Sequence, residues 1–231
     1  MNEVERIKAA YEKRAAADPG DIYSWFNPAT ALHLHNQERA VLKLLRRQGL
    51  TDLAGTRILE VGCGGGAEIA NFLKYGARAG NVAGVELLPA RAAACRRRHP
   101  GVDVRLANAE QLPFADGVFD IVCQFVMFSS ILDMEMKKRI AAEMMRVTRL
   151  GGTLIWYDYF VSKPGNRDVR GIRKKEIVGL FPGCRFDFRK ESLAAPLNRL
   201  VARRSVTAAQ LLQAMPFLRS HYLVAITKGA G

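Results

Sequence analysis

The chain of 231 residues lacks the features that assign several common protein classes. None of its apolar runs approaches the roughly 20 residues that a membrane-spanning helix needs. The N-terminus opens with acidic residues and has no apolar core of the kind found in signal peptides, which predicts a cytoplasmic protein. Its four cysteines are scattered without a Cys-x-x-Cys pair or a Cys/His cluster, so we expect reduced thiols and no metal site.

Acidic residues are also scarce relative to basic ones. The chain has 22 Asp and Glu and 35 Lys and Arg, which gives a formal net charge of +13. Residues 159–204 alone hold 12 basic and four acidic side chains. Such a field would attract an anionic partner, whether a phosphorylated sugar, a carboxylate, an acidic lipid headgroup or a nucleic acid. A solvated basic surface explains the same charges equally well.

The most informative feature present is a glycine-rich turn that follows an apolar strand. Residues 58–66 read Ile-Leu-Glu-Val-Gly-Cys-Gly-Gly-Gly. Gly62, Gly64 and Gly66 permit a sharp turn and the close approach of a ligand. Glu86 ends the next apolar run, 20 residues after Gly66, where a carboxylate can accept hydrogen bonds from a ribose. The pattern predicts a nucleoside-binding site.

The spacing of the glycines separates two cofactor classes. A dinucleotide-binding turn reads Gly-x-Gly-x-x-Gly and seats a pyrophosphate on a helix N-terminus, but here Ala67 takes the last position. The pattern Glu-x-Gly-x-Gly-x-Gly at 60–66, followed by Glu86, instead resembles the class I S-adenosylmethionine-dependent methyltransferases of the small-molecule type. Residues 105–120 resemble that family's adenine-side segment, and residues 146–153 resemble its entry to the fifth strand.

The resemblance implies S-adenosyl-L-methionine as cofactor, S-adenosyl-L-homocysteine as product, and a Rossmann-like α/β three-layer sandwich. Its seven-stranded sheet would be mostly parallel with an antiparallel last strand. Glu86 would bind both ribose hydroxyls, and Asn108, where relatives usually carry Asp, would meet the adenine amino group. Cys63 is expected to be a small filler in the turn. The expected cofactor-binding residues are Glu60, Gly62, Cys63, Gly64, Gly66, Glu86, Leu87, Asn108, Ala109, Glu110 and Gln124.

Hydrophobic periodicity predicts an N-terminal helix that ends before residue 18 and a second helix over 28–48, where Asn27 is an N-cap and Pro28 suits the first turn. Further strands are expected at 57–62, 81–86, 102–107, 119–125, 152–158, 185–190 and 221–227, and further helices at 66–76, 89–98, 133–148 and 205–215. We expect residues 1–50 to form a helical lid of the same domain as the methyltransferase core. That core would span residues 51–231 and carry a basic insertion near 159–219.

The acceptor should lie over the carboxyl ends of the fourth and fifth strands, so residues 124–130 and 156–159 would form its floor. The lid would come from the N-terminal helices, the loop at 159–171 and the insertion at 191–219. The candidate substrate or lid residues are Tyr11, Tyr23, Phe26, Phe128, Tyr157, Arg167 and Arg170. For the aromatic residues before the second helix, ordinary packing on the sheet is the commoner role.

Methyl transfer to a hydroxyl requires a base for the departing proton. The candidates are Asp158, His33 and His35, whereas His99 and His221 are less well placed. A lone histidine is more often structural than catalytic. We therefore expect O-methylation of a small-molecule or glycan acceptor, which the basic stretch would suit if the acceptor is anionic.

Two other functions stay open. The pI near 10.0 suggests an RNA or DNA methyltransferase. Against it, no Asn/Asp-Pro-Pro-Tyr motif follows the fourth strand to hold a flipped base, and residues 123–129 are mostly apolar. The second alternative is a non-catalytic adenosylmethionine-binding protein. The sequence does not predict an oligomeric state.

Overall fold

The computed structural model describes residues 2–17, 20–162 and 165–229. They form one seven-stranded sheet with the strand order β3-β2-β1-β4-β5-β7-β6. The first five strands run parallel, and β7 is antiparallel to both of its neighbours. This confirms the expected α/β fold and the antiparallel last strand. The strands are β1 (Ile58–Val61), β2 (Val82–Glu86), β3 (Asp103–Leu106), β4 (Phe119–Phe125), β5 (Thr148–Tyr159), β6 (Arg185–Leu193) and β7 (Arg219–Thr227).

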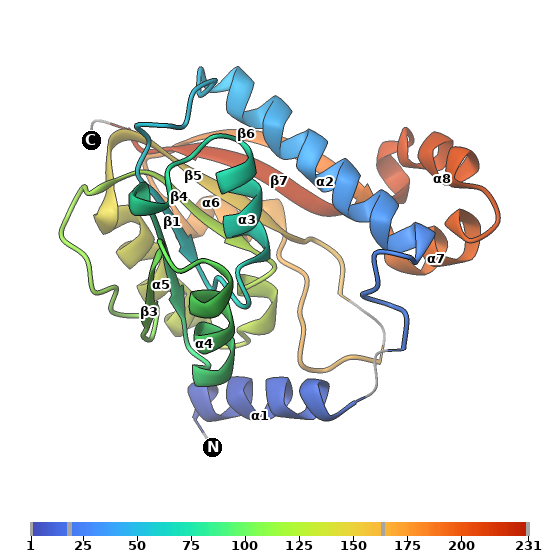
Figure 1. Cartoon of the computed structure of the whole chain (residues 1–231), viewed down its shortest axis with the longest axis horizontal. Helices are drawn as coiled ribbons and strands as arrows, with labels where there is room; N and C mark the ends of the chain where they lie inside the picture. The colour runs from blue at the N-terminus through green and yellow to red at the C-terminus, as the bar shows by residue number, and fades with distance from the viewer. Residues whose placement is uncertain (1, 18–19, 163–164, 230–231) are drawn as a thin grey trace.

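Helices cover both faces of the sheet and give the three layers (Figure 1). The helices are α1 (Glu3–Ala16), α2 (Pro28–Arg47), α3 (Ala67–Lys74), α4 (Pro89–Arg98), α5 (Met134–Val147), α6 (Lys174–Leu180), α7 (Ala195–Ala202) and α8 (Val206–Gln213). One apolar cluster lies between the sheet and α2, α3 and α4, and a second lies between the sheet and α5 and α6. Because the central strands are buried on both faces, they are continuous apolar runs.

The two N-terminal helices occupy different places. Helix α2 begins as predicted, because Asn27 Oδ1 accepts a hydrogen bond from the backbone N–H of Ala29 at 3.0 Å and Pro28 follows the cap. Its buried residues, Leu44 and Leu45 among them, make α2 part of one helical layer. Helix α1 lies apart from α2 along one edge of the molecule, and residues 20–27 lead from it to α2 (Figure 1).

The structure differs from the predicted elements mainly after residue 147. Strand β5 begins at Thr148 rather than at 152, and a register shift separates its first residue from the rest of its pairing with β4. Helices α6 and α7 were not predicted. Helix α6 has no side-chain cap and buries Ile177 and Leu180, so tertiary packing rather than a local signal defines it.

Within the described ranges, no helix combines the length and the apolar composition that are needed to cross a bilayer.

Candidate active site

The glycine turn lies at the carboxyl end of β1 and has no room for side chains. The backbone N–H groups of Gly62 and Cys63 both donate to Val85 O, at 2.8 and 3.0 Å. Gly62 and Gly64 have φ angles of 75° and 56°, which favour glycine. A Cβ on Gly62 would lie 2.8 Å from the sulfur of Met127, and one on Gly64 would overlap the guanidinium of Arg91. The turn therefore needs glycine for conformation and for space.

Glu86, at the carboxyl end of β2, is bonded directly to this turn. Its Oε2 accepts a hydrogen bond from Gly64 N at 2.8 Å, and its Oε1 accepts one from Leu88 N at 2.9 Å. Arg91 Nε lies 3.9 Å from Oε2. The predicted ribose-binding carboxylate thus lies beside the glycine turn, held by backbone donors in a fixed orientation.

Two further carboxyl groups, those of Glu60 and Glu68, lie near the turn. Glu60 is buried, and its Oε2 has no hydrogen-bond partner among the residues that the structure describes. Burial, together with the nearby Glu68 and Glu86, holds the pKa of Glu60 well above its usual range. Burial also raises the pKa of Glu68, whose carboxylate accepts hydrogen bonds from Gln37 at 2.6 Å and Asn71 at 3.0 Å. Glu60, Glu68 and Glu86 therefore surround the glycine turn with carboxyl groups, and we call this arrangement the cradle.

Helix α1 reaches this cradle through a cation–π contact. The guanidinium carbon of Arg91 lies 4.8 Å from the ring centre of Tyr11, and that of Arg14 lies 4.9 Å from the same ring. Arg91 therefore connects α1 to Glu86 and Gly64. Tyr11, a predicted lid residue, lies over the cofactor side of the site.

Apolar side chains follow Glu86 and Asn108 in the sequence and in space. Leu87, Ala109 and Met127 are partly buried and pack against one apolar cluster. Asn108 uses its side chain within its own turn, because its Nδ2 donates to Glu110 Oε2 at 2.9 Å and its Oδ1 accepts from Glu110 N at 3.1 Å. In this structure Asn108 therefore orders the loop that carries Ala109.

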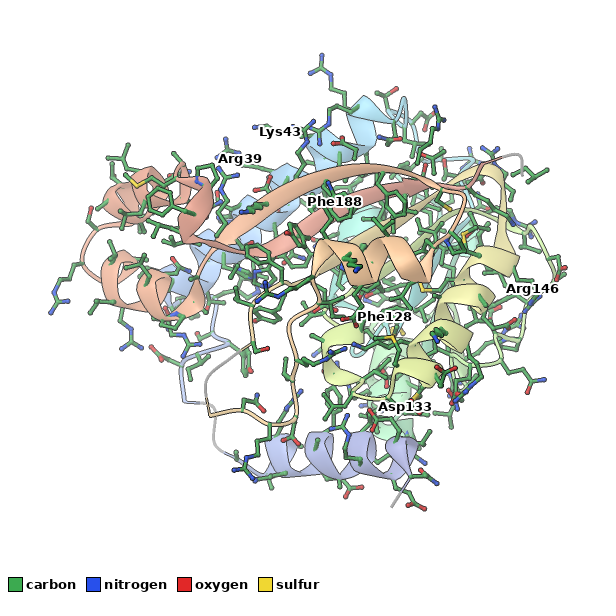
Figure 2. All side chains as sticks on the ribbon, turned by 180° about the vertical axis from the view of Figure 1, so that it is seen from behind. Arg39, Lys43, Phe128, Asp133, Arg146 and Phe188 are labelled. Carbon is green, nitrogen blue, oxygen red and sulfur yellow. The ribbon has the colours of Figure 1, made fainter. Side chains whose placement is uncertain are left out.

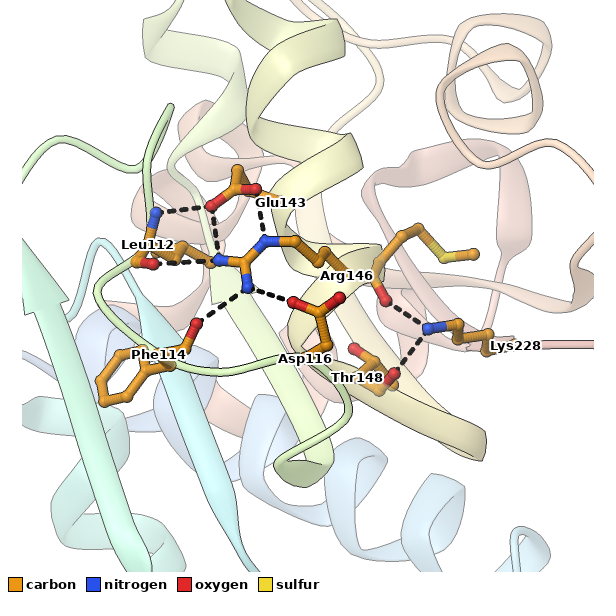
Figure 3. Close-up of polar contacts among 8 residues, drawn as sticks. Leu112, Phe114, Asp116, Glu143, Arg146, Thr148 and Lys228 are labelled. Atoms are coloured by element: carbon orange, nitrogen blue, oxygen red, sulfur yellow. Dashed lines mark hydrogen bonds and ion pairs between the residues drawn. The ribbon is translucent and has the colours of Figure 1, made fainter.

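The adenine-side segment is fastened to α5 by Arg146 (Figure 3). Its guanidinium donates to Leu112 O at 3.0 Å, to Phe114 O at 2.8 Å and to Asp116 Oδ1 at 2.6 Å. Glu143 accepts from Leu112 N at 2.7 Å and also from Arg146. Segments 105–120 and 146–153, which both resemble the family pattern, are thus joined by hydrogen bonds into one unit.

The turn after β4 is strained. Val126 has a φ of 55°, a conformation that a β-branched residue rarely adopts, and its N–H donates to Tyr157 O at 2.7 Å. Gln124 is buried beneath this turn, where its Oε1 accepts a hydrogen bond from Met127 N at 3.0 Å. The strain positions Met127 directly over Gly62.

A cluster of rings lies at the carboxyl end of β5. His221, in β7, pairs with Tyr159 in the sheet, and its ring centre is 4.0 Å from that of Tyr159 and 4.8 Å from that of Tyr157. His33, from α2, lies 5.6 Å from His221. Nδ1 of His221 is 3.0 Å from Ser220 Oγ, whereas its buried Nε2 lacks a partner in the described part of the chain. Burial lowers the pKa of both histidines, so both are neutral near pH 7.

The comparisons with known proteins agree with this geometry. A family described as "Methyltransferase domain" matches residues 59–156, which include the glycine turn, Glu86 and the turn after β4. Residues 59–156 therefore form a methyltransferase domain, and these similarities support the class I S-adenosylmethionine-dependent methyltransferase family for this chain.

A relative of this methyltransferase is the phthiotriol/phenolphthiotriol dimycocerosates methyltransferase of Mycobacterium leprae, which is 33% identical over 147 residues. The alignment covers 61% of this chain and 52% of the relative, so the chain spans about half the length of the curated relatives it matches. Two solved structures share the fold. Phosphoethanolamine N-methyltransferase 1 of Haemonchus contortus has a TM-score of 0.66 at 12% identity and covers 100% of this chain and 50% of its own. Geranyl diphosphate C-methyltransferase of Streptomyces coelicolor has a TM-score of 0.60 at 17% identity, with 94% and 86% covered.

The cradle of this methyltransferase fits the family's cofactor. Adenosylmethionine carries an ammonium and a sulfonium. A positive charge beside Glu60 would lower its raised pKa, and an ammonium would donate a hydrogen bond to the unpartnered Oε2. Arg91 is paired with Glu86, its Nε 3.9 Å from Oε2, so its own charge is balanced by that carboxylate. Glu86 would hold the ribose, while Leu87 and Met127 would cover the adenine.

The three predicted base candidates lie in different surroundings. Asp158 is fully buried, and its oxygens accept hydrogen bonds from Ser129 N at 3.0 Å and Tyr159 N at 2.8 Å. Burial raises its pKa to about 6. His35 is exposed and lies 5.6 Å from the ring of Trp25, so only His33 of this pair joins the ring cluster. Residues two apart on a helix point to different sides.

The remaining predicted lid residues also differ in burial. Phe128 is buried against Trp156, with ring centres 4.5 Å apart, and lies inside the molecule (Figure 2). The expectation that Tyr23 and Phe26 pack on the sheet is wrong, since both side chains are exposed to solvent. Arg170 donates to Glu176 at 2.8 Å, away from the cradle, and Arg167 is exposed.

Sequence reasoning missed Arg91 and judged His221 less well placed, but the antiparallel β7 brings His221 beside Tyr159. Val126 and Met127 lie within the predicted floor at 124–130, although neither was named individually. No local signal marks Arg91, because its role depends on contacts between elements far apart in sequence. Cys63 is buried in the turn, and burial raises the pKa of its thiol, as suits a filler rather than a nucleophile.

Proposed function

We propose that this chain methylates an oxygen of a hydroxylated small-molecule acceptor, with His33 as the base. The observation that carries the proposal is the pair of neutral imidazoles at the carboxyl end of β5, of which His33 is partly exposed and His221 is buried. The partly exposed imidazole of His33 can reach an acceptor and take its proton, whereas Asp158 is fully buried with both carboxylate oxygens bonded to backbone N–H groups. The curated relatives support a hydroxyl acceptor, because the compound in their name, phthiotriol, is a triol.

A chain of contacts connects His33 to the glycine turn. Gln37 follows His33 by one helical turn in α2, and its Nε2 donates to Glu68 Oε1 at 2.6 Å. Glu68 lies in the first turn of α3, which begins directly after Gly66. His33 is therefore on the part of α2 that faces the cofactor cradle.

Each group then has a distinct task. S-adenosylmethionine, when bound, supplies an electrophilic methyl group. Glu86 and the backbone of the glycine turn orient the nucleoside, and Met127 with Tyr11 limits access of water. His33 is only partly buried, so it can meet an acceptor hydroxyl and take its proton. His221, which is buried beside it, stays neutral, because burial and then a proton on His33 both lower the pKa of His221.

Under this proposal Asp158 has a positioning role. Its Oδ2 accepts a hydrogen bond from Ser129 N, which joins the end of β5 to the segment that follows Met127, and its Oδ1 accepts one from Tyr159 N of the same strand. Tyr157 supports the other side, where its hydroxyl lies 2.5 Å from Ser192 Oγ. The floor of the acceptor site is thus held by strands β5, β6 and β7 together.

The test compares His33→Asn with His35→Asn, which changes the exposed histidine of the same helix. Label from methyl-labelled cofactor would be followed into a fractionated small-molecule extract in a single turnover. We expect His33→Asn to lower the rate by about 100-fold or more while cofactor affinity stays unchanged. His35→Asn should match the wild type. Equal rates in the two variants would overturn the role of His33.

A further inference from the structure

Helices α7 and α8 and the short helix Pro216–Leu218 carry apolar side chains on two sides. The inner side packs on a small apolar cluster around Ala202 and Ala209. The outer side leaves three large apolar side chains in solvent: Leu200 is 60% exposed, Leu211 67% and Phe217 77%. Apolar side chains gathered on the solvent side of a segment mark an interaction surface.

A second group of exposed rings adjoins these helices. In the segment before α2, Tyr23 is 78% exposed, Trp25 60% and Phe26 97%. The two segments are joined directly, because Arg203 pairs with Asp21 at 2.9 Å and Asn198 Nδ2 donates to Ala29 O at 2.8 Å. Figure 1 shows α7 and α8 beside the beginning of α2, at one end of the molecule. Residues 21–26 and 195–218 are therefore one surface, which we call the apolar end.

Arginines border the apolar end. Arg199, Arg203 and Arg204 line a hollow of about 490 Å³ together with Leu200. Only Arg203 forms an ion pair, and the other two have none with any residue of the described ranges. These arginines belong to a chain with a net charge of +13. Exposed rings bordered by unpaired arginines match the chemistry of an anionic bilayer surface, where rings enter the interface and arginines meet headgroups.

We propose that the apolar end docks on the surface of an anionic lipid bilayer. Aromatic side chains such as Trp25 favour the membrane interface, since one part of the ring is apolar and the indole N–H is polar. The positive charge selects this occupant over a neutral apolar partner, because basic side chains gain energy near anionic lipids. No membrane-spanning helix is required, since the rings would enter only the interface.

The apolar end also continues into the acceptor side of the active site. Burial raises the pKa of Tyr159, in the ring cluster with His221, and after Asp158 the nearby Tyr23 and Arg199 also influence it. A docked molecule would therefore hold the cluster close to the bilayer surface. An acceptor dissolved in the bilayer would have a short path to His33, although docking itself does not depend on the proposed reaction.

The chain contains its own reporter of docking. It has two tryptophans, and Trp156 is buried, so a change in tryptophan emission on docking reports on Trp25. We expect a blue shift and co-sedimentation with phosphatidylcholine vesicles that contain phosphatidylglycerol, but not with pure phosphatidylcholine vesicles. Raised salt should weaken the binding. Neither cofactor nor acceptor is present, so failure of the catalytic proposal would leave this result unaffected.

Matched variants complete the test. Phe26→Ser with Phe217→Ser should lower vesicle affinity by about tenfold or more for each ring. Arg199→Gln with Arg204→Gln should remove most of the dependence on phosphatidylglycerol. Leu150→Ser, an exposed apolar residue far from this end, is the control and should bind like wild type. Absence of a shift and of co-sedimentation in the wild type would overturn the proposal. So would a dimer in size-exclusion chromatography that only the phenylalanine variants dissociate, because the rings would then contact a second copy.

Discussion

The carboxylate of Glu86 accepts a hydrogen bond from the backbone N–H of Gly64 at 2.8 Å, so the ends of two neighbouring strands form one binding element. Parallel pairing of β1 with β2 brings them together, because Val61 pairs with Val85 and each strand ends within one residue of that pair. The ribose-binding group and the glycine turn therefore cannot move independently.

The first prediction concerns this element. Glu86→Ala removes the carboxylate that would bind the ribose, and we expect cofactor affinity to fall by about 100-fold, since hydrogen bonds to charged groups contribute about 1.5–3 kcal/mol each. Gly64→Val should abolish binding, because φ at this position is 56° and the added carbons would collide with Arg91. Isothermal titration calorimetry measures both. Glu12→Ala, at an exposed position of α1, is the control, and unchanged affinity in both site variants would refute the assignment.

The second prediction concerns Arg146. Arg146→Met removes the donors that hold Leu112, Phe114 and Asp116, and we expect a loss of about 1–3 kcal/mol in the free energy of unfolding. Cofactor affinity should also fall, because the adenine-side segment loses its attachment to α5. Urea unfolding and calorimetry measure the two effects. Arg139→Met, in the same helix, breaks one ion pair of an exposed arginine with Glu110 and should cost clearly less than Arg146→Met.

The third prediction concerns the pH dependence of stability through Asp158. Burial raises its pKa from 3.8 to about 6, so the folded protein binds this proton more tightly than the unfolded chain does. The resulting stabilisation is complete below about pH 3.8 and is lost as the pH rises through 6. Relative to Asp158→Asn, the wild type should therefore lose about 2.4 kcal/mol of unfolding free energy between pH 4 and pH 7. A difference that stays constant across this range would show that Asp158 is not perturbed.

The fourth prediction concerns the pH dependence of methyl transfer. Burial lowers the pKa of His33, so the imidazole stays neutral below the usual histidine value of about 6.5. The rate should therefore decline on the acidic side with a midpoint below 6.5, at pH values where the protein is still folded. His35→Asn should leave this profile unchanged. A midpoint at or above 6.5 would exclude His33 as the titrating base.

Much of the cofactor half of the site could be predicted from the sequence because its signals are local. A glycine turn follows an apolar strand, and a carboxylate ends the next one. Parallel pairing of adjacent strands then brings Gly64 and Glu86 together without further information. Asn27 and Pro28 defined the start of α2 for the same reason, since a cap depends on neighbouring residues.

The acceptor half depends on contacts that no local pattern encodes. His33 and His221 meet only because α2 crosses β7 and because β7 runs antiparallel to β5 in a register that pairs His221 with Tyr159. The orientation of the Asp158 side chain could not be predicted from the sequence either. Side chains alternate along β5, so Trp156 and Asp158 face the side of α5 while Tyr157 and Tyr159 face α2. The sequence predicted where β5 ends, but it did not predict which face of the sheet the Asp158 carboxylate lies on.

Exposure of the apolar end could not be predicted either. Tyr23 and Phe26 have the composition of core residues, and only the packing of α7 against α2 shows that the space beside them is open to solvent. Short helices such as α7 take their position from the elements they touch.

The central claim is methyl transfer to a small molecule, and one assay tests it directly. Wild-type protein and Glu86→Ala would be incubated with methyl-labelled S-adenosylmethionine and a cell extract separated into small-molecule, lipid, protein and RNA fractions. We expect label in the small-molecule or lipid fraction with the wild type and none with Glu86→Ala. Label in RNA, or no transfer by a protein that binds the cofactor, would contradict it.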